Sequence, residues 1–95
     1  MRTITLDGAR WRSQADFYSA LLDVIGDPGW HGRNLDALEE TLRMGHVHTI
    51  NPPFAIHISG AAVMAEEVRA YLDRFLALAA DLRADGIVVD VTLES

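Results

Sequence analysis

Two periodicities divide the chain into alternating strands and helices. Polar and apolar residues alternate in three short segments, as in strands with one buried face. Apolar residues recur at three- and four-residue spacing in three longer segments, as in amphipathic helices. The expected strands are residues 2–6, 54–59 and 87–93, and the expected helices are residues 14–25, 35–44 and 61–84, with a loop over residues 46–53.

Residues typical of a helix N-terminus precede the two shorter expected helices. Ser13 and Asp16 resemble a capping box with Asp in place of Glu, and Asn34 is a favourable N-cap for the next helix. An unbroken helix over residues 61–84 would be ~36 Å long at ~1.5 Å per residue. A chain of this length has a diameter near ~32 Å. We therefore expect a break near Met64.

The order of these segments predicts the fold class. Strands separated by helices favour right-handed crossovers and a parallel sheet. One face of that sheet would carry Thr5, His57 and Asp90, which is too polar for a face covered by helices. We expect a two-layer α/β domain over residues 1–95, with a three-stranded parallel sheet and about three to four helices chiefly on one face.

Composition excludes several classes of function. The 95 residues contain no Cys, so no thiolate nucleophile, disulfide or zinc–thiolate site can form. No apolar run approaches the ~18 residues of a membrane span, and Met1–Arg2 leads into strand-like residues without the apolar region of a signal peptide. We therefore expect a cytoplasmic protein that makes no contact with a membrane.

The charge balance indicates the chemistry of a partner. Eight Arg and no Lys oppose 14 acidic residues, for a net charge of −6. Because the arginines do not cluster, direct binding to nucleic acid is disfavoured and a basic partner is favoured.

The acidic residues concentrate on the second expected helix. Asp36, Glu39 and Glu40 are spaced to project together into solvent. The preceding loop adds two aromatic rings, Trp30 and His31. Such a surface suits a partner lined with Arg and Lys. The alternative is a solvated helix face on which Asp36 favours the helix N-terminus by ~0.3–1 kcal/mol.

The same segment carries a family resemblance. Residues 30–42, WHGRNLDALEETL, resemble a motif of the barstar family, aromatic-x-Gly-x-Asn-Leu-Asp-Ala-Leu-x-acidic-x-Leu. Members of this family are intracellular inhibitors of barnase-type ribonucleases. The resemblance implies a barstar-like fold and an inhibitor or immunity protein without enzymatic activity or cofactor. It implies a monomer that blocks the basic active site of a secreted-type ribonuclease before export, with carboxylates in place of RNA phosphates.

The resemblance also assigns residues by position. Trp30 corresponds to a contacting aromatic residue, Glu40 to the central carboxylate, and Asp36 and Asp81 to further acidic contacts. The full expected partner-binding set is Trp30, His31, Gly32, Asn34, Asp36, Glu39, Glu40, His46 and Asp81. The chain departs from the family pattern at four positions, namely His31 for an aromatic residue, Arg33 for an acid, Glu39 for Trp and Glu40 for Asp.

Asp81 and Asp85 lie near the expected end of the last helix, where the helix dipole disfavours anions. Either a partner's cation would compensate them, or Arg83 and solvent would screen them.

Two alternatives remain at the level of sequence. The acidic surface could bind another basic protein. His46 and His48, with His57 and Asp90, could instead supply imidazole and carboxylate ligands for zinc or a similar ion. In the simpler interpretation, His57 forms a hydrogen bond with Asp90. The chain has no phosphate-binding glycine loop or dinucleotide fingerprint.

Overall fold

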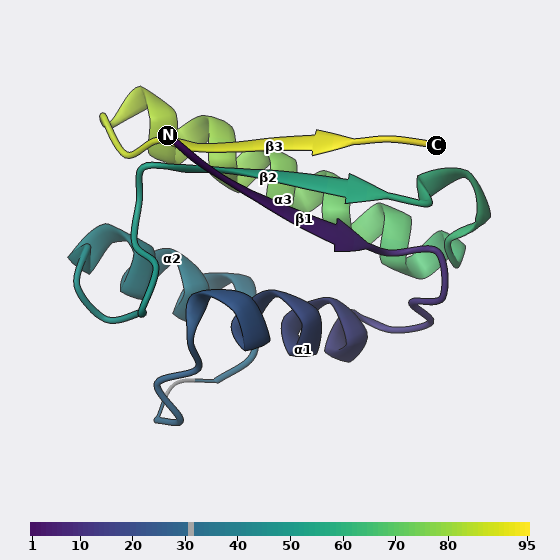
Figure 1. Ribbon diagram of the computed structural model, residues 1–95, viewed down its shortest axis with the longest axis horizontal. Helices are drawn as coiled ribbons and strands as arrows, with labels where there is room; N and C mark the ends of the chain where they lie inside the picture. The colour runs from purple at the N-terminus through teal and green to yellow at the C-terminus, as the bar shows by residue number, and fades with distance from the viewer. Residues whose placement is uncertain (31) are drawn as a thin grey trace.

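A computed structural model describes residues 1–30 and 32–95 and confirms the expected fold class (Figure 1). A parallel three-stranded sheet has β2 at its centre, and Arg2 and Val89 flank Phe54 in register. The elements in chain order are β1 (Arg2–Asp7), α1 (Gln14–Ile25), α2 (Leu35–Met44), β2 (Phe54–Ser59), the 3-10 turn η1 (Ala61–Val63), α3 (Glu66–Ala84) and β3 (Val89–Leu93).

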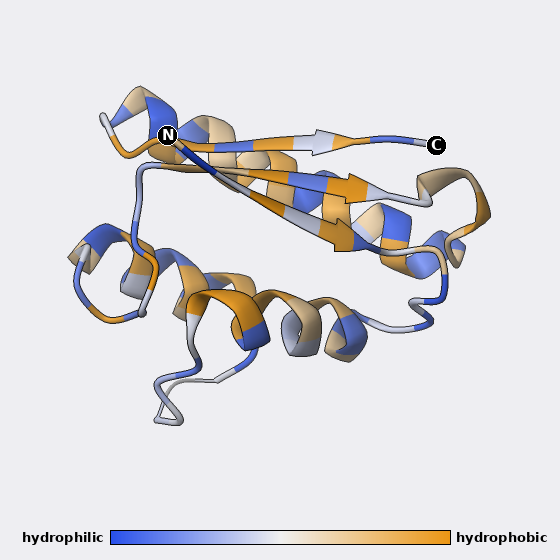
Figure 2. Ribbon diagram, in the orientation of Figure 1, coloured by the Kyte–Doolittle hydropathy of each residue, from blue (hydrophilic) through white to orange (hydrophobic). Residues whose placement is uncertain are grey.

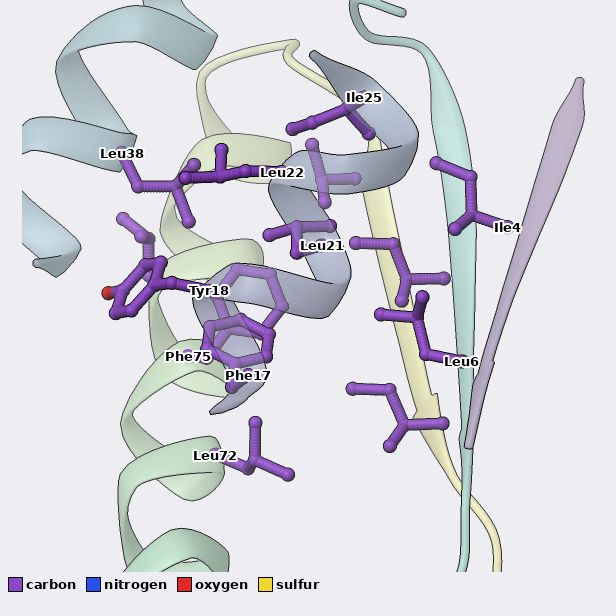
Figure 3. Close-up of a cluster of buried hydrophobic side chains, with 14 of the residues drawn as sticks. Ile4, Leu6, Phe17, Tyr18, Leu21, Leu22, Ile25, Leu38, Leu72 and Phe75 are labelled. Atoms are coloured by element: carbon purple, nitrogen blue, oxygen red, sulfur yellow. The ribbon is translucent and has the colours of Figure 1, made fainter. Parts of the chain in front are cut away.

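The helices cover one face of the sheet, because the strands bury alternate residues. Along β1, Ile4 and Leu6 are buried while Thr3 and Thr5 are exposed. The same alternation of hydrophobic and hydrophilic positions is visible along the strands in Figure 2. Figure 3 shows Ile4 and Leu6 directed toward the side chains of α1 and α3. The result is a single core between one sheet layer and one helix layer.

Aromatic rings occupy the centre of the helix layer. Phe17 packs against Tyr18 and Phe75 with ring centroids 4.9 and 5.0 Å apart. The hydroxyl of Tyr18 shares a hydrogen bond with that of Tyr71, joining α1 to α3. Burial first, and then this hydrogen bond, raise the pKa of Tyr18 far above its ordinary value.

The break expected near Met64 is confirmed, with η1 before it and α3 after it. Met64 has extended backbone angles and buries its side chain, while the longest dimension of the molecule is 33 Å. The last strand begins at Val89 rather than at Ile87 as expected. The reason is that the Ile87 amide still donates to the Leu82 carbonyl, so Ile87 belongs to the turn that closes α3.

The open face of the sheet is polar, as expected, but its pairs differ from the expected one. His57 Nε2 lies 2.6 Å from a carboxylate oxygen of Glu94, not beside Asp90. Asp90 is instead paired with Arg83, which reaches it from the last turn of α3. Over the described ranges 1–30 and 32–95, no helix combines the length and the hydrophobicity needed to cross a membrane.

Candidate functional site

Helix α2 presents its acidic residues because its opposite side is anchored. The Asn34 carboxamide oxygen accepts a hydrogen bond of 2.8 Å from the Ala37 amide and thereby caps the helix. Leu38 and Leu42 are buried, which confirms two of the three leucines expected in the stripe, whereas Leu35 is only partly buried. Asp36 and Glu40 lie on the opposite side of α2, one helical turn apart, and both are exposed.

Helix α3 contacts α2, and Figure 1 shows that the two helices run in roughly the same direction. At their C-terminal ends, the Arg43 guanidinium donates to the Asp85 carboxylate at 2.9 Å. Near their earlier turns, Asp36 of α2 and Arg74 of α3 line one shallow depression of about 190 Å³. The two helices therefore form one continuous surface.

Asp81 lies on the side of α3 that faces this surface. Helical periodicity places it on the same side as Arg74, seven residues earlier, and Asp85, four residues later. Arg74 and Asp85 both lie against α2. The fold therefore brings Asp81 toward the carboxylates of α2, although 41 residues separate it from Glu40 in sequence.

These carboxylates fall into two groups. Asp36, Glu40 and Asp81 are exposed, and none of them forms an ion pair or side-chain hydrogen bond within residues 1–30 and 32–95. By contrast, Glu39 and Asp85 both accept hydrogen bonds from Arg43, each at 2.9 Å. We call Asp36, Glu40 and Asp81 the acidic triad.

Among the described residues, Arg83 pairs with neither Asp81 nor Asp85, which corrects the part that sequence assigned to Arg83. Its guanidinium extends to Asp90 on the open face of the sheet. Asp85 is partnered by Arg43 from α2 instead.

The loop before α2 is held by its own polar contacts. Asp27 accepts from the Gly29 amide at 2.8 Å and pairs with Arg33 at 3.1 Å, and Arg33 also donates to the Ser19 hydroxyl. Trp30 keeps 64% of its surface exposed. His31, which belongs to the expected set, lies outside the described residues.

Gly32 has a steric role in this loop. A Cβ at position 32 would lie 2.8 Å from the Asn34 side-chain nitrogen. The capping atom of Asn34 is its side-chain oxygen, so a larger residue at position 32 would require the Asn34 carboxamide to shift beside the cap of α2.

The histidines of the 46–53 loop do not converge. His46 is exposed, and its Nδ1 lies 3.0 Å from the Met44 carbonyl oxygen. His48 is buried between the Thr41 hydroxyl, 2.8 Å from Nε2, and the Gly26 carbonyl, 2.7 Å from Nδ1. No group of three potential metal ligands is close enough to hold an ion in the part of the chain that the structure describes.

Sequence reasoning missed two structural residues beside the site. Thr41 was not expected to be buried, and its contact with His48 attaches α2 to the loop that follows. A signal was present, since Thr41 is three residues after Leu38 and therefore shares its buried side. For Arg43, the i, i+4 spacing indicated the pair with Glu39, but no local pattern indicated Asp85.

Comparison with known proteins supplies a family. No curated protein matches the chain. The family described as barstar (barnase inhibitor) matches residues 1–94 of the 95-residue chain. The match covers all seven elements of the fold and both helices of the acidic surface. The chain therefore belongs to the barstar family of barnase inhibitors.

Proposed function

We propose that this chain is an inhibitor, and not an enzyme, that closes the active site of a barnase-type ribonuclease with the acidic triad and the neighbouring loop. The observation that carries the proposal is that the acidic triad is exposed and unpaired. Its three carboxylates, on two adjacent helices, lack a cationic partner within the described chain. A ribonuclease active site, which binds the phosphates of RNA, offers the missing cations.

Charge complementarity explains how the inhibitor would block its target. Carboxylates on rigid helices occupy the positions of substrate phosphates, and an inhibitor so placed excludes RNA without being cleaved. Ion pairs that become desolvated in the complex contribute both affinity and specificity. Glu40 has the central role in this proposal because it corresponds by position to the central carboxylate of the barstar family.

The expected partner-binding residues take different parts in this proposal. Trp30, with its large exposed ring, supplies apolar contact area next to the charges. Asn34 and Gly32 support the surface by starting α2 correctly. Glu39 already forms an ion pair with Arg43, so it contributes at the edge of the contact. His46 is exposed and lies just beyond the C-terminus of α2. His31 completes the aromatic loop in the proposed contact.

The partner is a basic, secreted-type ribonuclease, and the inhibitor protects the cytoplasm before that enzyme is exported. The free inhibitor is a monomer that needs no cofactor. A basic protein of another class remains the alternative partner for the same surface.

Titration of a panel of barnase-type ribonucleases, starting with barnase, tests the proposal. We expect RNA hydrolysis by at least one panel member to fall to background at one equivalent of inhibitor, with a one-to-one complex in light scattering. RNA hydrolysis that persists for every enzyme at a tenfold excess, with no complex formed, would contradict the proposal. Binding to unrelated basic proteins with equal affinity would instead support the alternative partner.

A further inference from the structure

Arg43 is a cation at the C-terminal end of the surface that α2 and α3 form, and Arg74 is a second cation beside Asp36. Its Nε donates to Glu39 and its Nη1 to Asp85, both at 2.9 Å, so that it connects α2 with α3. The hydrogen bonds that Arg43 donates, first to Glu39 and then to Asp85, raise the pKa of Arg43 above its ordinary value. About a third of the side chain, 35%, stays exposed. Arg43 is therefore a fixed positive charge that an approaching partner meets.

The two bonds leave part of the guanidinium unused. Arg has five N–H donors in one plane, and Glu39 and Asp85 occupy two of them. The other three donors find no acceptor among residues 1–30 and 32–95. Planar guanidinium groups with free donors pair best with carboxylates, which can accept two parallel hydrogen bonds.

Arg43 also divides the surface into two electrostatic regions. The acidic triad has no partner within the described residues and attracts cations, whereas Glu39 and Asp85 share a single cation, Arg43, which lies between them at the C-terminal end of α2. A partner cation placed against that end would meet Arg43 directly, and juxtaposed like charges disfavour binding. A uniformly basic contact face is therefore a poor match for this surface.

We propose that Arg43 is a specificity-determining residue, which selects a ribonuclease whose contact face places an Asp or Glu side chain against the C-terminal turn of α2 while its basic residues meet the acidic triad. This inference rests on the proposed function. The selected partner has a mixed face, with cations opposite Asp36, Glu40 and Asp81 and one carboxylate opposite Arg43. Ribonucleases that carry Arg or Lys at that position are rejected.

A charge-swap cycle tests this proposal on a ribonuclease that the wild-type protein inhibits. Each non-catalytic Asp or Glu that flanks the ribonuclease active site is changed singly to Lys. Affinities are then measured for the wild type, Arg43→Glu and Arg43→Gln. The matched control is Arg69→Glu, because Arg69 is also exposed and is paired with an acid four residues away, Asp73 on α3.

We expect one ribonuclease variant to bind the wild type at least about tenfold more weakly and to regain about tenfold with Arg43→Glu. Arg43→Gln should weaken binding of the unmodified ribonuclease, and Arg69→Glu should show neither effect. A merely structural clamp between α2 and α3 would lower the melting temperature without any rescue by charge swap.

Two results would overturn the specificity role of Arg43 while leaving the inhibitor function intact. In the first, Glu40→Gln weakens binding but no ribonuclease variant distinguishes wild type from Arg43→Glu by more than about twofold. In the second, Arg43→Gln binds more tightly than wild type, as expected if Arg43 only masks negative charge. If the wild-type protein inhibits no ribonuclease at all, both proposals fail.

Discussion

Exposed carboxylates on α2 and α3 differ in whether the chain itself partners them. Glu39 and Asp85 share Arg43, and their removal would strand a cation of the inhibitor. Asp36, Glu40 and Asp81 have no such partner within the described residues. Their removal should therefore leave the folded protein unchanged and affect only a complex.

Glu40→Gln tests this separation most directly. We expect the free energy of unfolding to change by no more than about 0.5 kcal/mol, because Glu40 is exposed and unpaired among the described residues. Binding to the ribonuclease should weaken by about 2–5 kcal/mol, since the partner's cations lose their counter-charge in a desolvated contact. Enzyme titration and thermal melting of the same samples give both numbers.

Glu66→Gln is the control for that experiment, because Glu66 is exposed in the first turn of α3, away from the triad. Its inhibition curve should overlay that of the wild type. If Glu40→Gln and Glu66→Gln inhibit equally well, the acidic triad is solvated helix surface and not the binding site.

Tyr18 predicts a loss of stability in alkaline solution. Burial, followed by the hydrogen bond to Tyr71, raises its pKa in the folded protein, whereas the unfolded chain has the ordinary value near 10. The folded state thus resists deprotonation, so the stabilisation is complete below pH ~10 and declines as the pH rises further. The slope is at most ~1.4 kcal/mol per pH unit for one group.

Urea unfolding between pH 8 and pH 11 measures this decline, with Tyr18→Phe as the comparison. The variant lacks the ionising hydroxyl, so its stability should fall less steeply above pH ~10. Parallel curves for the two proteins would show that Tyr18 does not govern the alkaline transition.

At the scale of elements, α2 works as a rigid support for the proposed contact. Asn34 caps its start, Leu38 and Leu42 bury one side, and Thr41 connects it to His48. Its C-terminal turn is joined to α3 through Arg43. A helix restrained at both ends can present Asp36 and Glu40 without reorganising when it binds, which lowers the entropic cost of association.

Asn34→Ala should show that this residue acts through the helix. Loss of the cap is expected to lower the free energy of unfolding by about 1 kcal/mol. Asn34→Ser keeps a capping oxygen and should retain most of that stability and most of the inhibition. If Asn34→Ser keeps the stability yet loses inhibition as fully as Glu40→Gln does, Asn34 would instead be a direct contact.

For the whole molecule, the decisive quantity is the net charge of −6 on a body only 33 Å long. An acidic molecule of this size attracts a basic partner before contact, and salt screens that attraction beyond a Debye length of ~8 Å at 0.15 M. We expect the association rate constant to fall markedly between ~0.01 M and 0.15 M salt, with a smaller change in dissociation. Stopped-flow mixing measures both rates, and an association rate independent of salt would exclude electrostatic steering.

Local patterns were sufficient to predict the elements and their order. Periods of two and of about 3.6 residues located the strands and helices, because each period reflects which side of an element faces the core. The break near Met64 followed from comparing helix length with the size of the domain. The acidic residues of α2 could be placed on one exposed side for the same reason, since residues one turn apart share a helix face.

Only the tertiary structure decided which charges meet. Arg43 and Asp85 are 42 residues apart, and their pairing depends on how α3 lies beside α2. His48 looked equivalent to His46 in sequence, yet one is buried between Thr41 and Gly26 while the other is exposed. A polar side chain on the surface can pair only with a group that the packing of the core brings near, and some surface side chains meet no such group. The sequence therefore determined which side of each strand and helix faces the core, because that side follows from the period of its apolar residues. The packing of the helices determined which of the exposed charges remain for a partner.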